Sequence, residues 1–155
     1  MRRGVARERR HSADRRRGNA LIEFALSFAL LFPLFTGAFQ FGYAYHVYNK
    51  LEIAMRGAAR YASLRTYDSA TATPSAGYAL AVANSAVYGN PAGGSLPVAP
   101  GLTTSNVQIT VTLDRGVPRN VRVAVTGYRL DALFATINLN GKPGVSFPYC
   151  GNFAP

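Results

Sequence analysis

The fold of this chain follows from the stretch Arg15-Arg16-Arg17-Gly18-Asn19-Ala20-Leu21-Ile22-Glu23-Phe24-Ala25-Leu26. A basic block ends in a glycine, and a long apolar run with one carboxylate near its start follows directly. From Gly18 to Asn49 there is no Lys or Arg, and Glu23 is the only formally charged residue. Because an unpaired carboxylate in hydrocarbon costs several kcal/mol, Glu23 indicates a specific partner or a specific use.

The apolar run is long enough to cross a lipid bilayer. A spanning helix needs about 20 apolar residues, and the run from Phe24 to Tyr48 exceeds that length. Tyr43, Tyr45 and Tyr48 lie at its far end, as is typical of an aromatic belt at the membrane interface. The arginines before the run place its near end in the cytoplasm. We therefore expect a transmembrane segment at about residues 22–48, with the chain after it outside the cytoplasm.

A cleaved secretory signal peptide is the rival interpretation. Its apolar core would have about 7–15 residues before a small-residue cleavage site. Here the run is longer, and bulky aromatic residues occupy the region after it, so that its length favours a retained membrane helix. Pro33 lies inside the run and removes one backbone hydrogen bond, which predicts a kink in that helix.

The same helix is expected to continue just beyond the membrane segment. Small and apolar residues recur there at helical spacing, namely Val47, Leu51, Ala54, Ala58, Tyr61 and Ala62. Glu52 is placed to pair with Arg56 one turn away, and the other basic residues, Lys50 and Arg60, also lie largely off that stripe. The pattern predicts one long helix over residues 19–65 with an amphipathic second half.

Residues 1–18 form a basic segment, with eight arginines against Glu8 and Asp14. This composition is typical of a disordered tail. Such a tail either binds nucleic acid through its phosphates or anchors the cytoplasmic end of a membrane segment. The adjoining apolar run favours the anchor, and the absence of interleaved aromatic residues disfavours nucleic acid. We expect a cytoplasmic leader peptide and no nucleic-acid partner.

The remainder, residues 66–155, has the pattern of a small domain. Residues 66–76 are rich in Thr, Ser, Ala and Pro, which is typical of a linker, and a short helix is expected over Tyr78–Tyr88. Alternating residues then predict strands, at 107–113, 121–126, 133–139 and 145–147, with loops at 114–120 and 141–144. The fold class is therefore α+β, a long helix capped by a small domain with a short helix and an antiparallel sheet.

The chain contains no recognisable catalytic, cofactor-binding or metal-binding motif. Its two histidines, His11 and His46, lie far apart in the sequence, and the acids outside the leader have no metal-ligand spacing. Cys150 is the single cysteine and can form no internal disulfide. We expect a structural or interaction protein rather than an enzyme, with no cofactor.

The basic leader, Gly18 at its end, the apolar helix and Glu23 five positions after the glycine together resemble the signal of prepilin peptidase substrates. With Pro33, Phe41-Gly42 and the Ala- and Arg-rich helix at 51–62, the first 65 residues are similar to the TadE-like family of pseudopilins. That family belongs to the tight-adherence (Flp-type) pilus systems of bacteria.

The resemblance implies cleavage between Gly18 and Asn19, and it implies a role for Glu23 in subunit assembly. It implies a minor pilin or pseudopilin in the inner membrane, with an extracytoplasmic C-terminal domain, that either enters a surface pilus or only primes its assembly. The implied partners are a prepilin peptidase, other pseudopilins, the major Flp-type pilin, the inner-membrane assembly platform and the lipid bilayer. The alternative is an uncleaved single-span membrane-anchored protein with no pilus role.

Overall fold

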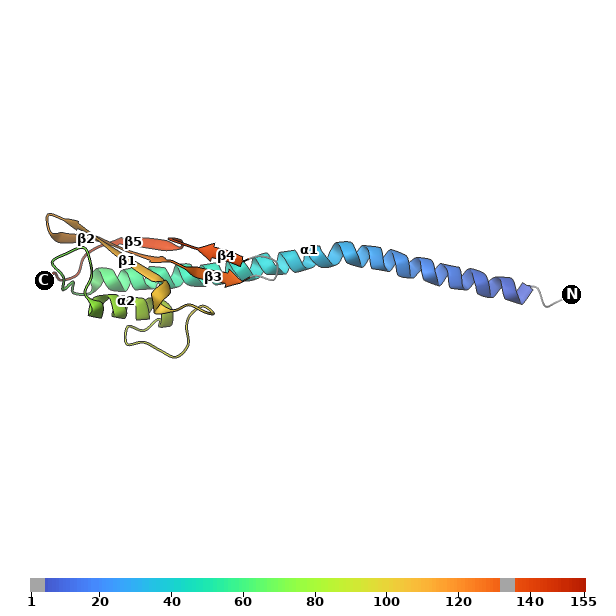
Figure 1. Cartoon of the computed structure of the whole chain (residues 1–155), viewed down its shortest axis with the longest axis horizontal. Coiled ribbons are helices and arrows are strands. Elements are labelled where there is room, and N and C mark those ends of the chain that lie inside the picture. Colours follow the sequence, from blue (N-terminus) through green and yellow to red (C-terminus); the bar gives the residue numbers. More distant parts are fainter. Residues whose placement is uncertain (1–4, 132–135) are drawn as a thin grey trace. The chain divides into compact units, whose positions relative to one another are not determined.

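The computed structural model divides the chain into two compact units, Met1–Gly42 and Tyr43–Pro155. It describes the backbone of residues 5–131 and 136–155 and the side chains of residues 19–131 and 136–155. The elements within these ranges are α1 (Val5–Leu64), α2 (Ala76–Tyr88), the 3-10 turn η1 (Thr104–Asn106), β1 (Val107–Asp114), β2 (Val117–Val125), β3 (Tyr128–Asp131), β4 (Thr136–Leu139) and β5 (Gly144–Pro148) (Figure 1). The expected α+β class, a long helix followed by a short helix and antiparallel strands, is confirmed.

Helix α1 begins at Val5, so the expectation of a disordered tail before Gly18 is wrong over residues 5–18. This segment has no proline and is rich in arginine, which is a good helix former. The apolar helix that follows provides a turn that is already formed, and extending a helix costs less than nucleating one. The helix ends at Leu64, next to its expected end.

The first unit carries its apolar side chains on the outside. Every large apolar residue from Leu21 to Phe41 is at least 53% exposed. The helix continues through Pro33, and the Thr36 hydroxyl donates a 2.8 Å hydrogen bond to the Phe32 carbonyl. The kink expected at Pro33 stays a prediction. A helix that is apolar all round is typical of a membrane span.

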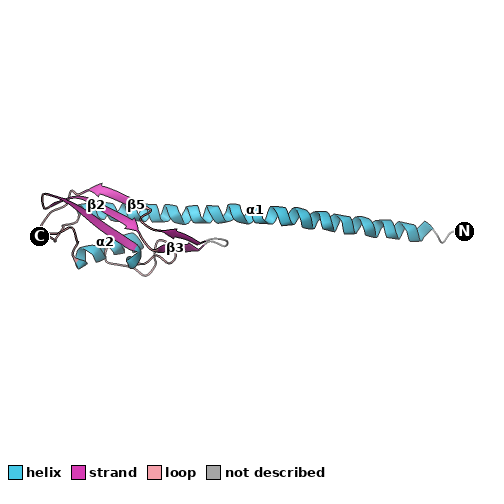
Figure 2. Cartoon of the chain, turned by 45° about the horizontal axis from the view of Figure 1, so that its top comes forward, coloured by secondary structure: helices cyan, strands magenta, loops and turns pink. Residues whose placement is uncertain are grey.

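The second half of α1 contributes one face to the core of the second unit. Its buried residues are Val47, Leu51, Ala54, Met55, Ala58, Ala59 and Ala62. This confirms the expected stripe, except that Tyr61 is only half-buried and that Met55 and Ala59 join the core. The strands and α2 lie alongside this part of α1 (Figure 2). The alanines of the stripe leave room for these elements to approach the helix closely.

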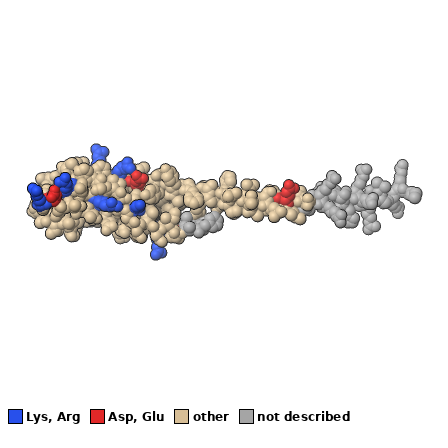
Figure 3. Space-filling view, turned by 90° about the horizontal axis from the view of Figure 1, so that it is seen from above, with Lys and Arg blue, Asp and Glu red and all other residues tan. Residues whose placement is uncertain are grey.

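The charged residues of α1 in the second unit lie off the buried stripe, as expected. Lys50, Arg56 and Arg60 are exposed, and Arg56 Nη2 lies 2.6 Å from Glu52 Oε1. The predicted ion pair is therefore confirmed. Basic side chains outnumber acidic ones on the face of this unit that Figure 3 shows.

The main sheet has three antiparallel strands in the order β1-β2-β5. The alternation expected in β1 is confirmed, with Val111 buried and its polar neighbours exposed. The loop expected at 114–120 is wrong, because Arg115 and Gly116 alone connect β1 to β2. Both residues have positive φ, 52° and 84°, as a two-residue type I′ hairpin turn requires. The tight turn lets both strands extend further than the polar composition of this segment indicates.

Strands β3 and β4 pair with each other in a separate two-stranded sheet. Strand β3 is not predicted from the sequence, because its four residues are too few for a clear periodic signal, although they alternate between buried and exposed. The strand expected at 133–139 is found at Thr136–Leu139, and its first residues lie outside those that the structure describes. The strand expected at 145–147 is confirmed as part of β5.

Helix α2 is capped at both ends. The Ser75 hydroxyl accepts a 3.1 Å hydrogen bond from the backbone N–H of Tyr78, as an N-cap residue does. Gly89 ends the helix with a φ of 70°, the left-handed conformation in which glycine carries no steric penalty. The expected linker at 66–76 is tied down rather than free, because the Tyr67 side chain within it is fully buried.

Candidate functional site

The predicted processing segment lies within helix α1. Gly18, Asn19 and Glu23 belong to one continuous helix, and a separation of four residues is about one helical turn. Asn19 and Glu23 therefore share a face of the helix. Both side chains are exposed, and the ion pairs among the described side chains do not include Glu23. The arrangement leaves the Glu23 carboxylate accessible to a cationic group one turn before it or on another molecule.

The peptide bond between Gly18 and Asn19 has helical backbone. A protease cleft binds extended backbone, so cleavage at this bond requires α1 to unwind locally. Glycine inside a helix is about 1 kcal/mol less favourable than alanine, because it loses the most backbone freedom. Gly18 is thus a point where unwinding this segment costs little.

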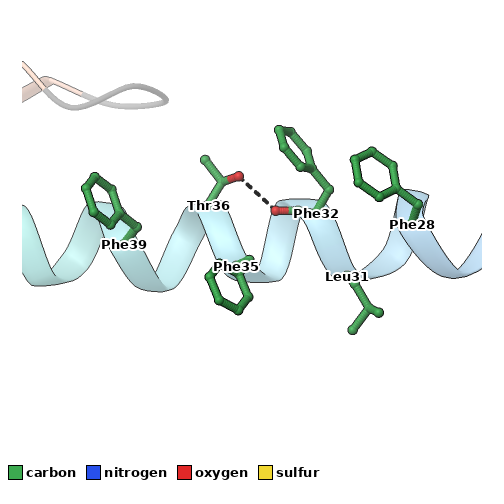
Figure 4. A pocket seen from close by; sticks show the side chains of 6 residues that line it. All are labelled: Phe28, Leu31, Phe32, Phe35, Thr36 and Phe39. Carbon is green, nitrogen blue, oxygen red and sulfur yellow. Dashed lines mark hydrogen bonds between the residues drawn. The ribbon is translucent and has the colours of Figure 1, made fainter.

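Phenylalanine side chains form a ladder on the apolar half of α1. The ring centroids of Phe24 and Phe28 are 6.0 Å apart, and those of Phe28 and Phe32 are 5.3 Å apart. An open recess on this helix is lined by Phe28, Leu31, Phe32, Phe35, Thr36 and Phe39 (Figure 4). All six residues come from α1, and Figure 4 shows Leu31 and Phe35 on the opposite side of the helix from Phe28 and Phe32. The recess is therefore part of an open helix surface, suited to acyl chains or a second helix.

One helix among the described residues is long and apolar enough to cross a membrane. Its candidate range is Asn19–Leu64, and none of the residues in its most apolar part is buried. An exposed apolar helix of this length is consistent with a single-pass membrane protein.

The C-terminal end of α1 is held by groups from distant parts of the chain. The last carbonyls of a helix lack intrahelical partners, and here the Tyr78 hydroxyl donates to the Ala62 carbonyl at 2.5 Å. The backbone N–H of Cys150 donates to the Ser63 carbonyl at 2.9 Å. These two bonds join α2 and the C-terminal segment to the same helix end.

The C-terminal segment completes this clasp, by which we mean the contacts of Tyr78 and residues 149–153 with the end of α1. The Tyr149 hydroxyl has two carbonyl acceptors within reach, Arg65 at 2.8 Å and Asn152 at 2.6 Å, and it accepts from the Tyr67 N–H at 2.9 Å. Gly151 is required here, since a Cβ atom would lie 2.6 Å from the Arg65 carbonyl oxygen. The chain therefore turns sharply after α1 because its own C-terminus holds that turn.

Tyrosines dominate the clasp. The rings of Tyr67 and Tyr78 meet edge to face with centroids 5.2 Å apart. Burial is the main cause that raises the pKa of Tyr67, Tyr78 and Tyr149 above the ordinary tyrosine value. Their hydroxyls thus stay protonated near neutral pH and act as hydrogen-bond donors. Sequence reasoning missed this cluster, because its members are far apart in the chain and follow no periodic pattern.

The structure shows no metal centre in the part of the chain that it describes. No group of three or more His, Cys, Asp or Glu side chains is placed to hold an ion among those residues. Cys150 is exposed, and its sulfur has only a weak contact of 3.8 Å with the Pro148 carbonyl.

The fold and the exposed segment together define a protein with one apolar helix that continues into a small α+β domain. Residues 18–60 match the family model described as TadE-like protein, so this part of the chain is TadE-like and the resemblance found in the sequence is confirmed there. The matched segment includes Gly18, Glu23, Pro33 and most of the amphipathic half of α1. Searches of curated proteins and of solved structures found no match to the chain.

Proposed function

We propose that this protein is a minor pilin or pseudopilin of a Tad (Flp-type) pilus system, made as a precursor and trimmed after Gly18 by a prepilin peptidase. The TadE-like segment at 18–60 supports the proposal, because that family is associated with Tad pili and is not an enzyme family. The observation that carries it is the exposed apolar helix with one carboxylate, Glu23, a turn after the predicted cleavage site.

Cleavage would change the charge at the start of the helix. Hydrolysis of the Gly18–Asn19 bond adds water, leaves a carboxylate on the leader and leaves an α-amine on Asn19. That amine has an ordinary pKa of about 7.7–8.0 and is largely protonated at neutral pH. The Glu23 carboxylate could form an ion pair with this protonated amine in the same subunit or in a neighbouring subunit. Either ion pair would remove the free-energy penalty of a lone carboxylate in hydrocarbon.

Removal of the leader would also release the helix from the cytoplasmic face. The eight arginines of residues 1–18 oppose movement of the helix out of the bilayer, since cationic flanks stay on the cytoplasmic side. Without them, the exposed apolar surface of α1 could pass from lipid to a helical bundle of pilin subunits. The partners in this proposal are the peptidase, other pseudopilins, the major Flp-type pilin and the inner-membrane platform.

Intact-mass spectrometry of the membrane fraction, with and without the peptidase, tests the processing step. We expect an N-terminus at Asn19 when the peptidase is active and at Met1 when it is absent. Gly18→Ala should block cleavage, whereas Gly37→Ala, the same change at a half-buried glycine with no atom within 4 Å of its Cβ position, should leave cleavage intact. A Met1 terminus in the presence of active peptidase would refute the processing proposal.

The assembly role of Glu23 has its own test. Glu23→Gln keeps the shape of the side chain but removes the charge, and we expect normal cleavage with loss of piliation. Asp114→Asn removes an exposed carboxylate that already pairs with Arg119 and serves as the control with normal piliation. Normal piliation of the Glu23→Gln strain would argue against the assembly role and leave the processing proposal standing.

An uncleaved single-span anchor is the second candidate function. The continuous helix through Gly18 and Asn19 favours it, because a helical bond resists a protease until it unwinds. This candidate predicts a Met1 terminus in both strains of the mass-spectrometry experiment and no effect of deleting the chain on piliation.

A further inference from the structure

The second unit has a groove between helix α1 and the edge strand β5. Its lining residues are Asn49, Glu52, Ile53, Arg56, Gly57, Arg60 and Phe147. All but Phe147 lie on α1, on the face that points away from the buried stripe. Among the described strands β5 pairs with β2 alone, and it contributes Phe147 to the groove.

The floor of the groove is apolar and open. Ile53 is 72% exposed, although it lies on the helix that forms the core. Gly57 follows one turn later, and a Cβ atom at that position would meet nothing within 4 Å. Phe147 is half-buried and packs partly against the core. An exposed isoleucine beside the space left by a glycine can bind one apolar side chain of another molecule.

The rim of the groove is cationic. Arg56 is neutralised by Glu52 at 2.6 Å, whereas the Arg60 guanidinium makes no ion pair or hydrogen bond to any described side chain or backbone group. The whole second unit carries nine Lys and Arg residues against four Asp and Glu, and Figure 3 shows their excess on one face. The charge of this surface therefore complements a negatively charged partner.

We propose that this groove binds an acidic segment of a different protein. A carboxylate of that segment pairs with the Arg60 guanidinium, and one of its apolar side chains packs over Gly57 beside Ile53. A second copy of this chain is the poorer occupant, because it has the same excess of positive charge and like charges across an interface cost several kcal/mol. The groove lies wholly within the second unit, so the proposal does not depend on cleavage after Gly18.

Site-specific photocrosslinking in the cell tests this proposal on the full-length chain. A photoreactive phenylalanine analogue replaces Ile53, and the control replaces Leu80, which is 58% exposed on α2 and does not line the groove. We expect an adduct from position 53 only, mapped by mass spectrometry to a segment of another protein that contains Asp or Glu. An adduct to a second copy of this chain, to phospholipid or to a segment without acidic residues would overturn the proposal, as would the lack of any adduct specific to position 53.

Charge exchange then tests the assigned contact. Arg60→Glu should lower the adduct yield about tenfold, since a reversed charge at the rim replaces attraction with repulsion. Arg129→Glu makes the same change at an exposed residue of β3 outside the groove and should leave the yield unchanged. Reversing the mapped carboxylate of the partner to Arg should restore the adduct with Arg60→Glu. Equal yields from Arg60→Glu and Arg129→Glu would show that general charge, not this groove, drives the contact.

Discussion

The clasp at the end of α1 makes a quantitative prediction for Tyr78→Phe. The Tyr78 ring is fully buried, and its hydroxyl donates to the Ala62 carbonyl at 2.5 Å. No backbone N–H outside the helix donates to that carbonyl among the described residues. The substitution keeps the ring packing and removes the one donor that, within the described structure, reaches this carbonyl from another element.

The expected loss follows from the buried group that is left without a partner. Leaving a buried carbonyl unsatisfied costs about 1–3 kcal/mol of unfolding free energy. For a domain of roughly 100 residues, each kcal/mol lowers the melting temperature by about 4 °C or somewhat more. We therefore expect Tyr78→Phe to melt about 4–12 °C below the natural chain.

Thermal unfolding of the full-length chain in detergent, followed by tyrosine emission, measures this difference. The chain contains no tryptophan, so tyrosine emission reports directly on the unit that holds the clasp. Tyr88→Phe is the matched control, because Tyr88 is half-buried and its hydroxyl has no hydrogen bond within the described structure. Equal melting temperatures for the two variants would refute the argument that the Tyr78 hydroxyl stabilises the helix end.

Three further predictions use the same melting assay. Leu51→Ala leaves a cavity at a fully buried site and should lower the free energy of unfolding by about 2–5 kcal/mol. Ile53→Ala, at a site that is 72% exposed, should lower it by about 0.5 kcal/mol or less. Equal losses would contradict the assigned buried and exposed faces of α1. Gly116→Ala should cost about 1 kcal/mol or more, because its φ of 84° is unfavourable for a residue with a Cβ atom; an unchanged melting temperature would argue against the two-residue turn. The contribution of the buried tyrosines to stability should be constant below about pH 10 and fall above it, because the unfolded chain then releases tyrosine protons that the folded chain retains. Tyrosinate absorbance should show late-titrating groups, and uniform titration near pH 10 would contradict the raised pKa of Tyr67, Tyr78, Tyr128 and Tyr149.

The elements that sequence reasoning predicted well are those with a strong local pattern. The stripe from Val47 to Ala62 has helical spacing, and the structure buries it. The alternation around Val111 predicts a strand with one buried face, and β1 has one. In both cases the side-chain period itself determines which residues can face a core.

Local composition misleads in two segments whose structure depends on a specific turn or on distant residues. The polar stretch at 114–120 indicates a long loop, but a two-residue turn at Arg115 and Gly116 lets the strands run through most of it. The segment 66–76 has the composition of a linker, yet Tyr67 within it is buried against the C-terminal segment. Composition describes how a segment tends to behave alone, and it does not include partners supplied from elsewhere in the chain.

The local sequence is sufficient to predict the long helix, the change from its apolar first half to its amphipathic second half, and the candidate segment from Gly18 to Glu23. The reason is that glycine, charge and periodic apolar residues act over a few neighbouring positions. The clasp of Tyr78 and Tyr149 and the groove between α1 and β5 become visible only in the folded second unit. Those sites join residues separated by up to about a hundred positions, and hydrogen bonds or apolar contacts between such residues exist only after the chain has brought them together. The local pattern thus predicts a membrane-spanning helix, whereas the tertiary contacts create the surface on which we propose that the protein binds a partner.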